Sequence, residues 1–503
     1  MKTKIILSIL VVAIAVVAFQ TSSGGSASDI PAVVLPVPGS PLISFRIQFG
    51  VGSIDDPEGK KGLTRLTASM LAQAGTRSRT YEDIVEFLYP MAAEVTARVD
   101  KEVTTIIGTV HKDHLEGYYA LLMEILGEPA FGADDFKRVR TNQLNFVSKT
   151  LRGANDEELG KQALNSFMYE GHPYGTPVAG TVSGVESITL DDVRAHYAKW
   201  FTRTNVTIGL AGSYDESLVA RLRGDLATLP VGESAARDLP TPPPIERMPV
   251  IAVEKECRAS AISMGFPISV TRSDPDFYPL LIANSYFGEH RTFNGRLMNR
   301  MRQVRGLNYG DYSYIENFIQ DGGSTFPQTN IPRRQQFFSI WIRPVPHEQR
   351  HFSIRLALWE LEKLVREGIS EEDFEATRRF LTNYCRLWAQ DQDRRLGYRM
   401  DSAYYGTDDI LEMLPTRLAT VTLDQVNEAI RRHLNFENIR IAVVTRGADE
   451  FMTALVSNAP SPIEYEAGGM SEEVLAEDRI VTAYRLDINR ADSKIVDVED
   501  MFE

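Results

Sequence analysis

The chain has 503 residues, of which 43% are hydrophobic and 24% are charged, and 54 basic against 68 acidic side chains give a net charge of −14. At roughly 100–200 residues per domain this length indicates more than one globular domain, and the composition excludes collagen-like and low-complexity proteins. A surface this acidic repels phosphate backbones, so no nucleic acid partner is expected, and 2 cysteines are too few for a cysteine-based zinc site.

The N-terminus has the pattern of an export signal. Lys2 and Lys4 precede an apolar run from Ile5 to Phe19, and a small, polar stretch follows it. These three parts are typical of a secretory signal peptide. The apolar run is shorter than the roughly 20 residues that span a bilayer, and a retained membrane anchor is the alternative. We therefore expect an exported protein of a bacterial periplasm or cell envelope, with no integral membrane span after signal cleavage.

The rest of the chain repeats itself once. Three pairs of segments match in the same order and at nearly constant separation: 134–136 with 372–374, 188–191 with 421–424, and 205–212 with 438–447. Each copy begins with a β-rich apolar segment, continues with amphipathic helices and ends in a β-branched strand. Because strands and helices are mixed irregularly, the predicted fold class is α+β, built from two homologous repeats.

A proline-rich stretch separates the two copies and is expected to act as a stiff spacer. The predicted organisation is a signal peptide (1–28), an N-terminal repeat (29–238), a linker (239–246), a C-terminal repeat (247–460) and a C-terminal tail (461–503). The tail loses the apolar periodicity and ends in acidic residues. It is therefore expected to run extended over the surface or to be partly disordered.

One predicted helix in the first copy has the frame of a metal motif without its ligands. The segment 62–71, followed by Gly75-Thr76, resembles the pitrilysin/insulinase-type zinc peptidases, whose active members carry an H-x-x-E-H motif in such a helix. Arg65, Ala68 and Ser69 stand at the three motif positions. Arginine stays protonated, alanine has no ligand atom, and a lone serine is a poor zinc ligand. The resemblance therefore implies a degenerate zinc site and no zinc in this chain.

The third zinc ligand of the family, a glutamate further along the chain, is also missing. No Asp or Glu occurs from Phe136 to Asn155, and the predicted helix there carries Gln143 and Asn145 instead. A Gly-His-Pro-Tyr-Gly element at 171–175, which follows in the family, is intact. The first copy thus keeps the family's flanking motifs. It has lost the H-x-x-E-H ligands and the later glutamate ligand.

The second copy retains a different motif. The segment from Arg302 to Tyr309 resembles the family element R-x-x-x-G-L-x-Y, whose Arg and Tyr face the zinc across a closed chamber. A guanidinium and a phenol are donors suited to carbonyl oxygens and oxyanions. The resemblance, which covers about residues 30–450, implies that Arg302 and Tyr309 bind substrate. Alternatively, Arg302 caps a helix and Tyr309 lies at a sheet edge.

A second metal motif occurs in the same copy. The segment His347-Glu348-Gln-Arg-His351 matches the H-E-x-x-H of ordinary zincins, which requires a helix that places both imidazoles on one face. Pro344 and Pro346 directly precede it, so these residues are expected to form a loop-to-helix entry. A solvated helix start is the preferred interpretation, and His347 and His351 are kept as alternative metal ligands.

The predicted function is a non-catalytic, peptide-binding subunit of a heterodimeric zinc peptidase, similar to the processing-peptidase branch of the family. In this prediction a catalytic partner of the same family supplies the zinc, and this chain supplies Arg302 and Tyr309 to an extended peptide substrate. Two alternatives stay open. One is a structural or scaffolding homologue without chemistry, and the other is an autonomous zinc hydrolase that uses His347, Glu348 and His351.

Overall fold

The computed structural model describes residues 30–503 except 235–237, 293, 320–325 and 466–468. The predicted signal peptide lies outside these described residues. Among the helices within them, none combines the length and the apolar character needed to cross a bilayer.

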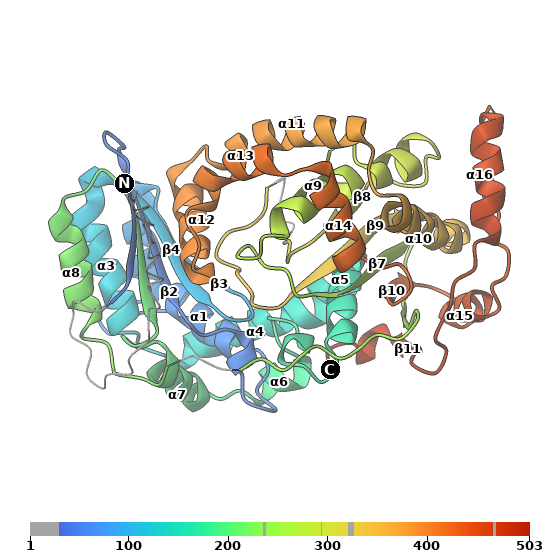
Figure 1. Cartoon of the computed structure of the whole chain (residues 1–503). Coiled ribbons are helices and arrows are strands. Elements are labelled where there is room, and N and C mark those ends of the chain that lie inside the picture. The colour runs from blue at the N-terminus through green and yellow to red at the C-terminus, as the bar shows by residue number, and fades with distance from the viewer. Residues whose placement is uncertain (1–29, 235–237, 293, 320–325, 466–468) are drawn as a thin grey trace, which may run out of the picture.

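The first repeat is built on a five-stranded sheet (Figure 1). Its strand order is β1-β5-β2-β4-β3, and only the β1–β5 pair is parallel. The strands are β1 (Ala32–Pro36), β2 (Leu42–Phe49), β3 (Glu94–Val99), β4 (Thr104–His111) and β5 (Val206–Gly212). Seven of the eight residues of β2 are buried, because helices cover both faces of the sheet at this central strand.

The second repeat contains a six-stranded sheet of matching topology. Its order is β11-β6-β10-β7-β9-β8, which reproduces the first sheet strand by strand once β11 is set aside. The strands are β6 (Val250–Glu254), β7 (Ser260–Ile268), β8 (Asp311–Tyr314), β9 (Gln336–Val345), β10 (Arg440–Thr445) and β11 (Lys494–Asp497). The equal strand order confirms the predicted α+β fold of two homologous repeats.

The helices also correspond between the repeats. Thr189 caps α7 and Thr422 caps α14, each with a capping box closed by the residue three positions later. The helices of the first repeat are α1 (Leu63–Ala72), α2 (Tyr81–Leu88), α3 (Leu115–Gly127), α4 (Ala133–Asn145), α5 (Asp156–Met168), α6 (Val182–Ser187), α7 (Leu190–Trp200) and α8 (Glu216–Leu226). Those of the second are α9 (Phe277–Gly288), α10 (Arg350–Glu367), α11 (Glu371–Trp388), α12 (Gln392–Tyr405), α13 (Ile410–Thr420), α14 (Leu423–His433), α15 (Ala448–Val456) and α16 (Glu472–Ala483).

Helix α5 of the first repeat packs on the sheet of the second. It lies against β7 and β10, and Leu159 and Ala163 share a buried apolar cluster with Ala261 and Val444 (Figure 1). The first repeat thus supplies part of the cover for the core of the second.

Helix α12 makes the reciprocal contact on the first sheet. It lies against β1, β2 and β5, and Leu396 and Met400 pack on Leu35 and Ala211. Gly209 of β5 permits this approach, because a Cβ atom there would overlap the sulfur of Met400. This exchange of helices joins the two repeats into one packed unit, with α12 seen beside the first sheet in Figure 1.

The C-terminal segment differs from the expected extended tail. Residues 472–483 form α16, and β11 pairs in parallel with β6 at the edge of the second sheet. Met501 and Phe502 are buried in the cluster that also contains residues of α5. The expectation was wrong because α16 buries only Asp478 and Val481, and because a four-residue strand and a single apolar pair leave almost no periodic signal in a sequence.

Candidate functional site

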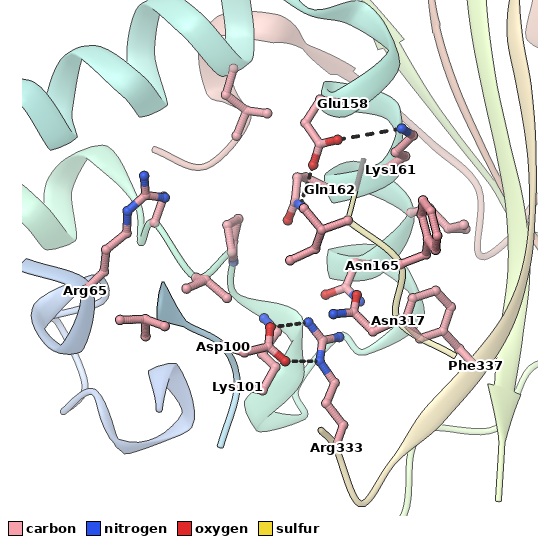
Figure 2. Close-up of a pocket in the computed structure, with 18 of the residues that line it drawn as sticks. Arg65, Asp100, Lys101, Glu158, Lys161, Gln162, Asn165, Asn317, Arg333 and Phe337 are labelled. Carbon is pink, nitrogen blue, oxygen red and sulfur yellow. Dashed lines mark hydrogen bonds and ion pairs between the residues drawn. The ribbon is translucent and has the colours of Figure 1, made fainter. Parts of the chain in front are cut away.

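A cavity of about 200 Å³ lies between the two repeats. The first repeat lines it with α1, the end of β3, α5 and a π-helix over Phe146–Ala154. The second repeat contributes Asn317, Phe318, Ile319, Arg333, Phe337 and Trp341. Figure 2 shows Arg65 on one side of this space and Glu158, Lys161, Gln162 and Asn165 of α5 on the other. A π-helix within an otherwise α-helical segment is frequently found at functional sites.

Asp56 fixes the beginning of α1. Its Oδ2 accepts the Gly62 amide at 2.7 Å, and its Oδ1 accepts the amide and the hydroxyl of Thr64 at 2.7 and 2.6 Å. Thr64 Oγ1 also lies 2.9 Å from Nε2 of His196. Burial raises the pKa of Asp56 to about 6 and lowers the pKa of His196 to about 3, so His196 is neutral at pH 7. These contacts hold α1 in place beside the cavity.

The three motif positions of α1 do not form a metal site. The Arg65 guanidinium lies 4.4 Å from the centroid of the Phe146 ring, Ala68 is fully buried, and Ser69 is half-buried. Gln143 donates to the carbonyls of Gly62 and Ala179 at 2.9 and 3.0 Å, which is a structural role. Within the described part of the chain, no three His, Cys, Asp or Glu residues are grouped as metal ligands. A cation stands where the motif requires a ligand, so these residues do not fit zinc.

Charged residues that the sequence did not single out line the rest of the cavity. Asp100 accepts two hydrogen bonds from Arg333, at 2.7 Å from Nε and at 2.6 Å from Nη2, and both side chains are buried. Burial lowers the pKa of the neighbouring Lys101 to about 7, and Arg333 adds to that effect. The charged run Asp100-Lys101-Glu102 after β3 could be seen in the sequence, but Arg333, the partner of Asp100, lies 233 positions away along the chain.

The α5 side of the cavity is held by its own contacts. Glu158 accepts from Gln162 at 2.9 Å and lies 3.7 Å from Nζ of Lys161. The Lys161 ammonium also lies 3.6 Å from the centroid of the Trp341 ring. The acidic side chains of the cavity are thus already engaged by basic or amide groups of the protein.

Arg302 and Tyr309 are brought together, but outside this cavity. Arg302 lies in a second π-helix, over Met298–Gln303. Tyr309 lies two positions before the edge strand β8. The Arg302 guanidinium carbon is 4.9 Å from the centroid of the Tyr309 ring, and Tyr309 is 75% exposed. Neither residue is among those that line the cavity. The pair is therefore separate from the cavity, with Tyr309 facing solvent and Arg302 half-buried.

Comparisons with known proteins agree with this architecture. The family model described as insulinase (peptidase family M16) matches residues 37–182, and the one described as peptidase M16 inactive domain matches residues 187–381. The chain belongs to the insulinase family. Arg65, Ala68 and Ser69 stand at the positions of its zinc motif, so the metal motif of this family member is degenerate.

Two proteins and one solved structure of known name are similar to this insulinase-family chain. A non-peptidase homolog, YmxG, of Helicobacter pylori is 21% identical over 80% of this chain and 88% of that protein. A crystal structure of a peptidase M16 inactive domain from Pseudomonas fluorescens matches with a TM-score of 0.73 at 21% identity, over 85% of this chain and 98% of that chain. A probable mitochondrial-processing peptidase subunit beta of Schizosaccharomyces pombe is 24% identical over 30% of this chain and 33% of that protein.

The H-E-x-x-H segment of this insulinase-family chain has other contacts. His347 lies in a 3₁₀ turn, with Nδ1 2.8 Å from Ser260 Oγ and Nε2 3.0 Å from the Cys257 carbonyl oxygen. His351 is buried in the first turn of α10, and burial lowers its pKa to about 3. The turn-to-helix transition between the two residues agrees with the expected loop-to-helix entry, but the expectation of a solvated helix start was wrong for His351, because this first turn packs against the rest of the second repeat. Both ring nitrogens of His347 face protein oxygens in this arrangement.

We expect the partly buried charge of Arg65 to lower the stability of the chain. Arg65→Met is expected to raise the free energy of unfolding by about 0.5–2 kcal/mol, the range commonly found for a single stabilising substitution. Methionine still packs on Phe146, whereas the desolvation that lowers the pKa of Arg65 disappears with the charge. Thermal unfolding followed by circular dichroism measures the change. Lys137→Met, at an exposed position of α4, is the control, and a lower melting temperature for Arg65→Met alone would contradict the expectation.

Proposed function

We propose that this chain is a non-catalytic, peptide-binding subunit that completes the active site of a zinc-bearing partner of the same family. The observation that carries the proposal is the Arg302–Tyr309 pair. The Arg302 guanidinium lies over the ring of the exposed Tyr309, while the described residues of the chain include no group of three metal ligands. The N-terminal signal pattern supports a site of action in the bacterial periplasm or cell envelope.

The chemistry of the pair suits substrate binding in another chain's site. Arg302 lies over the face of the Tyr309 ring, an arrangement worth about 0.5–1 kcal/mol at an exposed position. This contact restricts both side chains before any ligand arrives. A preorganised guanidinium and phenol can donate to the carbonyl oxygen of a peptide and to the oxyanion that forms when water attacks it. The zinc and the water must then come from the partner.

The edge strand β3 supports the binding of an extended peptide. It pairs with β4 on one side and is the last strand of its sheet, so its other edge can accept a further strand. Its last residue, Val99, lines the cavity between the repeats. A peptide added to β3 would therefore lead towards this cavity.

Reconstitution tests the proposal. The purified chain is mixed with a family member from the same organism that carries an intact H-x-x-E-H motif, and cleavage of an internally quenched fluorogenic peptide is followed. We expect no cleavage and no stoichiometric zinc in this chain alone, and cleavage by the mixture. Tyr309→Phe is expected to lower kcat of the mixture about 100-fold, the cost of one lost oxyanion donor.

The control is Tyr89→Phe, which removes the hydroxyl of another exposed tyrosine. It is expected to leave kcat unchanged. One zinc ion per chain by elemental analysis of this chain alone would overturn the proposal. If the mixture cleaves the peptide and Tyr309→Phe has no effect on kcat, the scaffolding alternative replaces the substrate-binding role.

A further inference from the structure

We infer that the cavity between the repeats binds a carboxylate of a peptide ligand, with Arg65 as the cation that holds it. The inference rests on the proposed peptide-binding function and specifies the class of ligand. It depends on three features of the cavity: its excess of basic groups, the engagement of its acidic groups, and its unused hydrogen-bond donors.

Basic side chains outnumber acidic ones around the cavity. Of the lining residues, four are basic, namely Arg65, Lys101, Lys161 and Arg333, whereas two are acidic, Asp100 and Glu158. Both oxygens of Asp100 accept from Arg333, and Glu158 faces Lys161 and Gln162. Asp100 and Glu158 therefore pair with Arg333 and Lys161 and do not pair with Arg65. Among the described residues, Arg65 pairs with no carboxylate, and its guanidinium lies over the Phe146 ring instead.

Further donors remain unused at the far side of the space. Nη1 of Arg333 and Nδ2 of Asn317 are buried and have no hydrogen-bond partner within the described portion of the chain. Both residues line the cavity, and Figure 2 shows them close to Asn165. Buried donors without partners are costly, so a ligand that supplies acceptor oxygens is favoured there. Peptide carbonyl oxygens have that chemistry.

The walls between these polar ends are apolar. Phe146, Leu164, Phe337 and Trp341 contribute to them, so the cavity offers contact area to an aliphatic chain. The combination fits a short peptide segment with its carboxylate on Arg65 and its carbonyl oxygens on Arg333 and Asn317. In the insulinase family this is the position of the zinc motif, and here a fixed positive charge occupies it. The carboxylate belongs either to an acidic side chain or to a free C-terminus.

Titration calorimetry with three pentapeptides on the full chain tests the inference. The probes are acetyl-Ala-Leu-Glu-Leu-Ala-amide, its glutamine analogue acetyl-Ala-Leu-Gln-Leu-Ala-amide, and that glutamine sequence with a free terminal carboxylate. At least one carboxylate peptide is expected to bind about tenfold or more tightly than the neutral amide, the typical gain from a charge-assisted hydrogen bond. Whether the side-chain or the terminal carboxylate gains affinity identifies the source.

Variants assign the preference to Arg65. Arg65→Gln is expected to abolish the preference, so that the three peptides bind with similar affinity. Arg65→Lys, which keeps the charge and loses the planar fork, is expected to retain part of it. Lys137→Gln removes one exposed positive charge away from the cavity and should retain all of it.

The outcomes separate the two proposals. Equal binding of all three peptides by the wild type, or a preference that persists in Arg65→Gln, overturns the carboxylate site and leaves peptide binding intact. Binding of none of the three peptides to the wild type overturns both. If Arg65→Gln does not fold, as judged by circular dichroism, an unchanged preference in Arg65→Lys counts against a bidentate contact at Arg65.

Discussion

Arg333→Met is expected to lower the free energy of unfolding by about 3–5 kcal/mol, the typical cost of removing one partner from a buried ion pair. Arg333 lies in the second repeat and Asp100 in the first, and two hydrogen bonds of 2.7 and 2.6 Å join them. Asp100 is 1% exposed, so the substitution leaves a buried carboxylate without its cation. Urea denaturation measures the loss.

Two comparisons show whether the ion pair itself is responsible. The double variant Asp100→Leu/Arg333→Met removes both charges and should recover most of the loss, because no uncompensated charge remains. Arg366→Met removes an exposed arginine that pairs with Glu362 at 2.6 Å, and it should change stability little. An effect of Arg333→Met no larger than that of Arg366→Met would show that the pair does not couple the repeats.

Phe502→Ala is expected to lower the free energy of unfolding by about 3 kcal/mol, as for other buried phenylalanines. Phe502 is buried with Met501 in the cluster that contains residues of α5 and of the π-helix over 146–154. Its carbonyl accepts the Val182 amide at 2.8 Å, and the preceding Met501 carbonyl accepts from Nε of Arg152 in the π-helix at 2.5 Å. The end of the chain thus supports one wall of the cavity.

Hydrogen exchange distinguishes this local role from a general loss of stability. In Phe502→Ala, amides of residues 146–154 are expected to exchange faster than those of β2 and β4, because the support of the π-helix is lost first. Glu503→Gln removes only a partly exposed partner of Arg152 and is the control. Uniform acceleration across both sheets would contradict the local role.

The duplicated fold was predictable because its signals are local. Threonine caps at 189 and 422 and β-branched strands at matching positions can be recognised in short windows of sequence. The absence of zinc ligands at Arg65, Ala68 and Ser69 was equally visible, since ligand chemistry is a property of each residue type.

The sequence by itself thus determined the α+β class, the repeat and the degenerate metal motif. Only the tertiary structure decided the exchange of α5 and α12 between the sheets, the Asp100–Arg333 ion pair, the docking of Phe502 and the separation of Tyr309 from the cavity. Each of these features joins or separates residues far apart in the chain. Secondary-structure periodicity reports which face of an element is buried, but it does not report which distant element covers that face.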